Sequence, residues 1–291
     1  MDVRAVAMGL VFALIWSSAF TSARIIVEAA PPLMALALRF LLSGGIGIAI
    51  ALFLGQTFKL TRGQWMSVLI FGICQNALYL GLNFVAMQTV EASLAAIIAS
   101  TMPLLVAAAN WGIFRERLPV MGLVGLAAGF AGVALIMVQR FDGGADPYGV
   151  ALCLIGAVAL TIATLAVRGA SSGGGNLLMV VGLQMIVGSI ALIPFALAFE
   201  TYAVAWSTPL VVAFAYTTLM PGLVATLIWF MLVDRIGPTR AATYHFLNPF
   251  FGVAIAALLL AEALTLSDVI GVTIIAGGIF MVQIARGARQ A

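Results

Sequence analysis

The sequence predicts an all-α integral membrane protein with ten transmembrane helices in two inverted five-helix repeats around a central cavity. Three observations support this prediction: the composition, ten apolar segments of membrane-spanning length, and an internal repeat. Hydrophobic residues make up 64% of the 291 residues and charged residues only 8%, whereas a soluble domain carries roughly 25% charged residues. Burial alone cannot absorb this excess, so lipid must surround most of the surface.

Apolar runs define the ten spans, because crossing the hydrocarbon core takes about 20 helical residues. The expected spans are residues 4–27, 32–54, 64–87, 91–112, 119–138, 148–168, 176–199, 209–233, 238–260 and 267–286. The connections between them are too short to hold a soluble domain. No Walker A string occurs, so an ATP-driven pump would need a partner that supplies the motor.

An internal repeat relates residues 84–138 to residues 230–284, at a shift of 146 positions without a gap. Nine of the 55 aligned positions are identical. The paired Pro103 and Pro249 and a shared E-x-L triplet are the main evidence for the repeat. Internal repeats in membrane chains are typical of transporters.

The distribution of basic residues predicts the orientation of the halves, which we expect at residues 1–140 and 141–291. With a cytoplasmic N-terminus, ten Arg and Lys residues fall on the inner side and only Arg140 in an outer loop, so both termini are expected in the cytoplasm. Five spans per half is an odd number, which inverts the second half. Inverted repeats can adopt two mirror-related states, open to either side of the membrane. A duplication fixed for packing alone is the alternative.

Spans one and two carry polar residues that mark inward-facing sides. In span one, Ser17, Thr21, Arg24 and Glu28 are four, three and four residues apart and form one stripe toward the outer end. The neighbouring Trp16 either lines a cavity or anchors in the lipid headgroups.

A costly charge, Arg39, lies inside span two. We expect it to pair with Glu28 or Glu91 near the outer end of the membrane, and binding of a substrate carboxylate is the alternative. Arg24, Glu28, Arg39 and Glu91 are therefore candidates for charge or gating roles.

Three prolines near the middle of their spans are expected to break helices. A proline removes the helical partner of the carbonyl four residues earlier, and a freed carbonyl at membrane depth needs protein, water or substrate. Pro103, Pro249 and Pro221 free the carbonyls of Ala99, His245 and Thr217. A packing kink is the alternative interpretation.

Aromatic, amide and hydroxyl side chains in several spans can surround one cavity that takes an organic solute. The candidate cavity residues are Trp16, Ser17, Asn76, Tyr79, Asn83, Ala99, Thr164, Tyr216, Trp229, Tyr244, His245 and Asn248. His245, the single histidine, either completes a helix-to-helix hydrogen bond or handles substrate or protons.

Glycines recur in spans five and ten, at Gly125, Gly129 and Gly132 and at Gly271, Gly277 and Gly278. Small residues let helix backbones approach closely, so we expect these faces to pack against neighbouring helices.

Enzyme and cofactor chemistry is not expected. Cys74 and Cys153 are expected to pack as small apolar side chains inside their spans. No metal-ligand spacing or mid-span carboxylate pair occurs. The string GASSG matches the G-x-S-x-G nucleophile motif around Ser171, but it opens a cytoplasmic loop far from His245 and reads as a linker. Nothing in the sequence suggests nucleic-acid binding.

The block "ASTMPLL … FRERLPVMGLVGLAAGFAGVALI" and its copy "FLNPFF … LLAEALTLSDVIGVTIIAGGIFMV" resemble EamA-type members of the drug/metabolite transporter superfamily. The chain is also similar to YddG-like amino acid exporters. The resemblance covers essentially the whole chain and implies a bacterial inner-membrane exporter with a central cavity. Proton coupling is commonly proposed for relatives, but no acidic residue here forms an obvious mid-span relay.

We therefore expect a secondary transporter that exports amino acids, with aromatic and other neutral ones favoured. A multidrug or other small-metabolite exporter is the alternative, ahead of an intramembrane enzyme or a non-transporting scaffold. Freed carbonyls near Ala99 and His245 can meet an ammonium group, and Asn76 or Asn248 a carboxylate. The expected partners are amino acids and the lipid bilayer; a monomer is compatible with the sequence, which does not define the oligomeric state.

Overall fold

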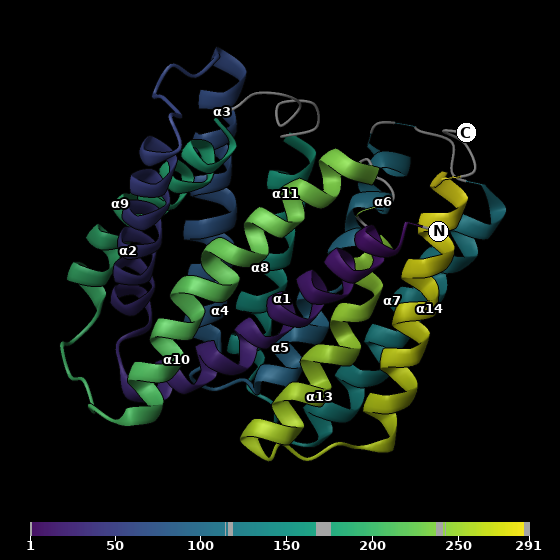
Figure 1. Ribbon diagram of the computed structural model, residues 1–291. Coiled ribbons are helices and arrows are strands. Elements are labelled where there is room, and N and C mark those ends of the chain that lie inside the picture. Colours follow the sequence, from purple (N-terminus) through teal and green to yellow (C-terminus); the bar gives the residue numbers. More distant parts are fainter. Residues whose placement is uncertain are drawn as a thin grey trace.

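The computed structural model describes residues 2–113, 115, 119–166, 176–236, 241 and 243–287. Every regular element in these ranges is a helix. In Figure 1, α2 and α9 lie side by side at one side of the bundle, α7 and α14 at the other, and α1 runs obliquely across the molecule between them. The expected all-helical architecture is confirmed.

Nine helices in the described part of the chain are long and apolar enough to cross a membrane, and a shorter apolar helix covers Tyr244–Leu260. The uninterrupted ones are α1 (Val3–Ala29), α2 (Pro32–Phe53), α7 (Val120–Asp142), α8 (Pro147–Ala166), α9 (Leu177–Phe199) and α14 (Leu266–Gly287). They agree closely with the spans expected from the apolar runs, because length and hydropathy are both readable along the chain.

Four spans are interrupted within the membrane. Span three comprises α3 (Arg62–Ile70), the π-helix η1 (Phe71–Leu80) and α4 (Gly81–Ala86); span four comprises α5 (Ala92–Ala99) and α6 (Met102–Gly112). Span eight comprises α10 (Thr208–Leu219), the π-helix η2 (Met220–Val224) and α11 (Ala225–Ile236); span nine contains the 3₁₀-helix η3 (Thr243–Leu247) and α13 (Asn248–Leu260).

Prolines account for three of these interruptions. Pro103 and Pro249 lie in the first turns of α6 and α13, and Pro221 lies in η2. A proline has no N–H to give and fits best at a helix start. No proline occurs in span three, so its π-helical segment could not be anticipated from a breaker residue; such segments are frequent at functional sites.

Glycines bring α7 and α14 into direct backbone contact. A Cβ atom on Gly125 would lie 2.8 Å from the carbonyl oxygen of Gly278, and one on Gly278 would lie 2.5 Å from the carbonyl oxygen of Gly125. Likewise, a Cβ atom on Gly132 would lie 2.9 Å from the carbonyl oxygen of Gly271, and one on Gly271 would lie 3.1 Å from the carbonyl oxygen of Gly132. The two helices therefore pack closely at these positions, as small residues permit.

One glycine of the expected packing face does not take part. A Cβ atom on Gly277 would meet nothing within 4 Å, whereas its neighbour Gly278 faces α7. Adjacent helical residues point about 100° apart, so one turn cannot present both to the same neighbour. The expectation for Gly277 was therefore wrong.

Side chains from one helix end satisfy the amides that begin another. Glu200, after α9, accepts from the amides of Leu33 and Met34 at 2.6 and 2.9 Å, and Gln56, after α2, accepts from the amide of Met179 at 2.9 Å. Each helix start has amides without an intrahelical partner. These contacts therefore join the end of α9 to the start of α2, and the end of α2 to the start of α9. We call the end that carries Val3 and Gly287 the terminal end, and the other the distal end.

Candidate functional site

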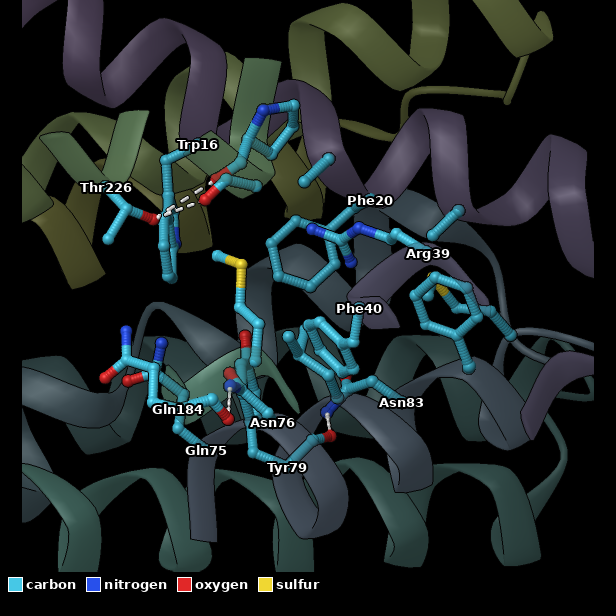
Figure 2. Close-up of a pocket in the computed structure, with 18 residues that line it drawn as sticks. Trp16, Phe20, Arg39, Phe40, Gln75, Asn76, Tyr79, Asn83, Gln184 and Thr226 are labelled. Carbon is cyan, nitrogen blue, oxygen red and sulfur yellow. Dashed lines mark hydrogen bonds between the residues drawn. The ribbon is translucent and has the colours of Figure 1, made fainter. Parts of the chain in front are cut away.

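A cavity in the interior of the bundle lies among α1, α2, η1 with α4, α9, and η2 with α11 (Figure 2). About 620 Å³ between the lining atoms is free of protein, part of it open to solvent, and the centres of water molecules can occupy about 40 Å³. That space suits about three waters, so a larger solute requires the wall to widen. The wall consists of Trp16, Ala19, Phe20, Ala23, Arg39, Phe40, Gln75, Asn76, Tyr79, Leu80, Asn83, Phe84, Met87, Gln184, Met185, Pro221, Gly222 and Thr226.

Amide side chains gather at one end of this cavity, where Figure 2 shows Gln75 and Gln184 close together. Asn76 Nδ2 donates to the carbonyl oxygen of Gln184 at 2.9 Å, joining η1 to α9. Thr226 Oγ1 donates to the carbonyl oxygen of Gly222 at 2.9 Å. Side-chain amides offer both donors and acceptors to a bound solute.

Arg39 lies at the other end, beside Phe20 and Phe40 in Figure 2. Its side chain is almost fully buried, with 4% of the residue exposed. Its Nε donates to the carbonyl oxygen of Thr217 at 3.1 Å. Since Thr217 stands four residues before Pro221, this is the carbonyl that the proline deprives of a helical partner.

The expected pairing of Arg39 with Glu28 or Glu91 was wrong. Glu28 accepts from Arg24 Nε at 2.7 Å, one turn away on the same helix, which is the usual spacing for such pairs. Glu91 pairs with Arg140, from the end of α7. Both carboxylates are thus engaged at the distal end, away from Arg39.

His245 belongs to an aromatic cluster between α1, α11 and η3 that is not part of the cavity wall. Its ring centroid lies 5.4 Å from that of Phe12 and 4.9 Å from that of Trp229. His245 Nδ1 hydrogen-bonds to Asn248 Nδ2 at 2.9 Å. The backbone oxygen of Asn248 accepts from Ser17 Oγ at 3.3 Å. Trp16 joins this cluster to the cavity, because it lines the cavity and its centroid lies 5.7 Å from that of Phe12.

The cavity brings together only some of the residues that the sequence singled out. Trp16, Asn76, Tyr79, Asn83, Arg39 and Pro221 line it. Outside its wall lie Ser17, Ala99, Thr164, Tyr216, Trp229, Tyr244, His245, Asn248, Pro103 and Pro249. Tyr216 hydrogen-bonds to Ser18 at 2.6 Å, and Thr164 Oγ1 donates to the carbonyl of Leu160 at 2.8 Å.

Sequence reasoning missed several residues of the wall, chiefly Phe20, Phe40, Gln184, Met185 and Thr226. Gln184 gave a usable signal, because a glutamine inside an otherwise apolar span is costly in lipid and marks an interior face. The phenylalanines gave none, since an aromatic ring suits lipid and cavity equally.

Ion pairs hold the distal end together. Arg140, at the end of α7, pairs with Glu91 before α5 and with Asp268 in the first turn of α14, the latter at 3.0 Å. Glu262, after α13, accepts from the amides of Ala92 and Ser93 at 2.8 and 3.0 Å. These contacts tie four spans together at this end.

The structure describes some of the features that the sequence analysis set aside as structural. Cys74 and Cys153 are free thiols. Over the described residues, no group of three potential metal ligands occurs. The segment around Ser171 lies outside those residues.

Comparisons with known proteins agree with a membrane transporter. The model of the EamA-like transporter family matches residues 3–138 and 147–284. The chain is 28% identical to the uncharacterized transporter YvbV of Bacillus subtilis, over 96% of this chain and 91% of that protein. It is 26% identical to the uncharacterized inner membrane transporter YedA of Escherichia coli K12, over 96% and 90%.

A solved crystal structure shares the fold, with a TM-score of 0.70, 20% identity and coverage of 97% of this chain and 99% of that one. The family match covers most of the sequence, and it assigns a multi-pass membrane transporter of small molecules. The chain belongs to the EamA-like transporter family.

Proposed function

We propose that this protein is a secondary transporter that exports neutral amino acids, aromatic ones favoured, from the cytoplasm across the bacterial inner membrane. The observation that carries the proposal is the cavity in the interior of the bundle, whose wall combines Trp and Phe rings with amides and one guanidinium. Such a wall can stack on an apolar side chain and hydrogen-bond the polar groups of the same solute. Four amide side chains line this wall, those of Gln75, Asn76, Asn83 and Gln184, and their oxygens can accept from an ammonium group.

Transport is proposed to proceed by alternating access between two inverted halves, residues 1–140 and 141–291. Reciprocal contacts support this, because Gly125 contacts Gly278 and Gly132 contacts Gly271. The shift of 146 positions relates Gly125 to Gly271 and Gly132 to Gly278, so each contact joins a residue of one half to the counterpart of the other residue. Contacts that are exchanged in this way are typical of twofold symmetry. The family match to residues 3–138 and again to 147–284 is in accord.

The narrow cavity and the ion pairs at the distal end support a state in which that end is closed. With both termini in the cytoplasm, the distal end faces outward, and export requires the contacts of Arg140 and Glu262 to separate. Inverted repeats provide a mirror-related state in which the opposite end closes instead.

A multidrug or other metabolite exporter is the second candidate. A site for cationic drugs would be expected to hold a buried carboxylate, because a desolvated cation needs a countercharge. None of the residues of the described wall is acidic, which favours the amino acid proposal.

The test is the flux of labelled phenylalanine, threonine and methionine into liposomes that hold the purified protein, with and without a pH gradient. Saturable flux that requires the protein and is competed by other amino acids would support the proposal. Acceleration by the gradient would demonstrate proton coupling. Folded protein that gives no flux above empty liposomes would contradict it and favour the second candidate.

Trp16→Ala should lower phenylalanine flux per folded protein by about ten-fold, or about 1.4 kcal/mol, because it removes the largest ring of the cavity wall. Trp111→Ala is the matched control, since Trp111 is 49% exposed and lies outside the wall. We expect the control to transport as the wild type does. Equal loss in both variants would show that Trp16 acts through general stability.

A further inference from the structure

Arg39 is a buried cation without a buried anion. Among the described residues, it makes one hydrogen bond, to the Thr217 carbonyl, and one ring contact, its Cζ lying 5.2 Å from the centroid of Phe40. It also lines the cavity, whose described wall holds no Asp or Glu. A charge inside a membrane protein is costly unless it is paired, and residues of this kind mark substrate or ion sites.

The hydrogen bond fixes Arg39 without using the end of its guanidinium. Nε is held by the Thr217 carbonyl, and no hydrogen bond to another described residue occupies the two terminal nitrogens. Those nitrogens are parallel donors at the spacing of two carboxylate oxygens, the geometry in which arginine binds carboxylates best. A lysine would not reproduce this arrangement.

We infer that Arg39 binds the carboxylate of the transported solute, so that the cavity selects apolar or aromatic carboxylates and excludes organic cations. The inference deepens the proposed function and rests on it for the route across the membrane. Phe20, Phe40 and Trp16 give an apolar body surfaces to pack against. A cation without a carboxylate would meet an uncompensated positive charge, which opposes entry.

Three probes that share a benzene ring test this directly: L-phenylalanine, 3-phenylpropionate and phenethylammonium. Their affinities are measured by equilibrium binding to the purified protein in lipid nanodiscs. We expect both carboxylates to bind and phenethylammonium not to bind. Arg39→Met should weaken both carboxylates at least about thirty-fold, the loss seen when one partner of a desolvated charge pair is truncated.

Arg39→Lys is the matched variant, because it keeps the charge and loses the paired donors. We expect binding weaker than the wild type but stronger than Arg39→Met, with an unchanged thermal midpoint. A residue with a purely structural role would instead lower the midpoint and leave the ranking of the three probes unchanged. Tighter binding of phenethylammonium than of 3-phenylpropionate, or no carboxylate binding at all, would overturn the inference.

The outcomes separate this inference from the proposed function. Binding of 3-phenylpropionate that depends on Arg39, with no phenylalanine flux, would uphold the carboxylate site and reject amino acid export. Phenylalanine flux that is equal in wild type and Arg39→Met would uphold export and reject the role of Arg39.

Pro221 acts as a positioning residue for Arg39. Pro221→Ala restores an N–H that competes for the Thr217 carbonyl, so the guanidinium shares its acceptor and is held less firmly. We expect about three- to ten-fold weaker binding of 3-phenylpropionate at an unchanged thermal midpoint. Pro194→Ala, an exposed proline inside α9 and outside the wall, is the control. Equal affinities in all three proteins would show that Pro221 does not position Arg39.

Discussion

Gly278→Ala is expected to lower the free energy of unfolding by about 3 kcal/mol or more, enough to reduce the yield of folded protein sharply. The added Cβ atom would lie 2.5 Å from the Gly125 carbonyl oxygen and 2.7 Å from the Gly129 amide nitrogen. Both are backbone atoms, which cannot rotate away as a side chain does. Relief requires α7 and α14 to separate, and this removes their packing along the whole contact.

The control is the neighbouring residue on the same helix. Gly277→Ala meets nothing within 4 Å, and alanine is the better helix former by about 1 kcal/mol. The thermal midpoint in detergent and the monodisperse fraction after solubilisation measure both variants. Gly278→Ala that is as stable as Gly277→Ala would show that α7 and α14 do not meet at these glycines.

Arg140→Met is expected to destabilise the protein by about 3 kcal/mol, because it leaves the Asp268 carboxylate buried without a countercharge. The side chain of Asp268 is 1% exposed, and Arg140 is its ion-pair partner at 3.0 Å. The loss falls at the distal end, where Arg140 also binds Glu91. The proposed alternating access requires this end to open, so the variant should also favour the opened state.

A second substitution separates charge from packing. Asp268→Asn in the Arg140→Met background removes the unpaired charge, so the thermal midpoint should recover partway to the wild type. Arg62→Met, at an exposed arginine that forms no ion pair with another described residue, is the control and should have no effect. A midpoint for Arg140→Met equal to that of the control would show that the pair adds no stability.

Hydropathy and proline chemistry made much of the fold predictable. Each span is a continuous apolar run, and the membrane requires such a run to be helical because its backbone has no other hydrogen-bond partners. The interruptions before Pro103 and Pro249 follow from the missing N–H of proline. The π-helix η1 was not predictable, because no residue in span three obliges the backbone to deviate.

The sequence predicted several polar residues of the candidate site, but it did not predict which inward-facing residues line the cavity. Asn76, Tyr79 and Asn83 stood out because polar groups are costly in lipid, and all three line the cavity. His245 stood out for the same reason, yet it packs against Phe12 and Trp229 outside the wall. The energetic cost of exposing a polar group to lipid shows that the residue turns inward. It does not show which interior residues it contacts.

The sequence by itself determined that this protein spans the membrane, where its spans lie and which residues turn away from lipid. These are local properties, summed along one segment at a time. Only the tertiary structure decided that Trp16 lines the cavity while Trp111 is half exposed, and that Arg39 is held by a carbonyl rather than a carboxylate. Such partners come from helices more than a hundred residues apart, and their choice depends on the rotation and depth at which the helices pack.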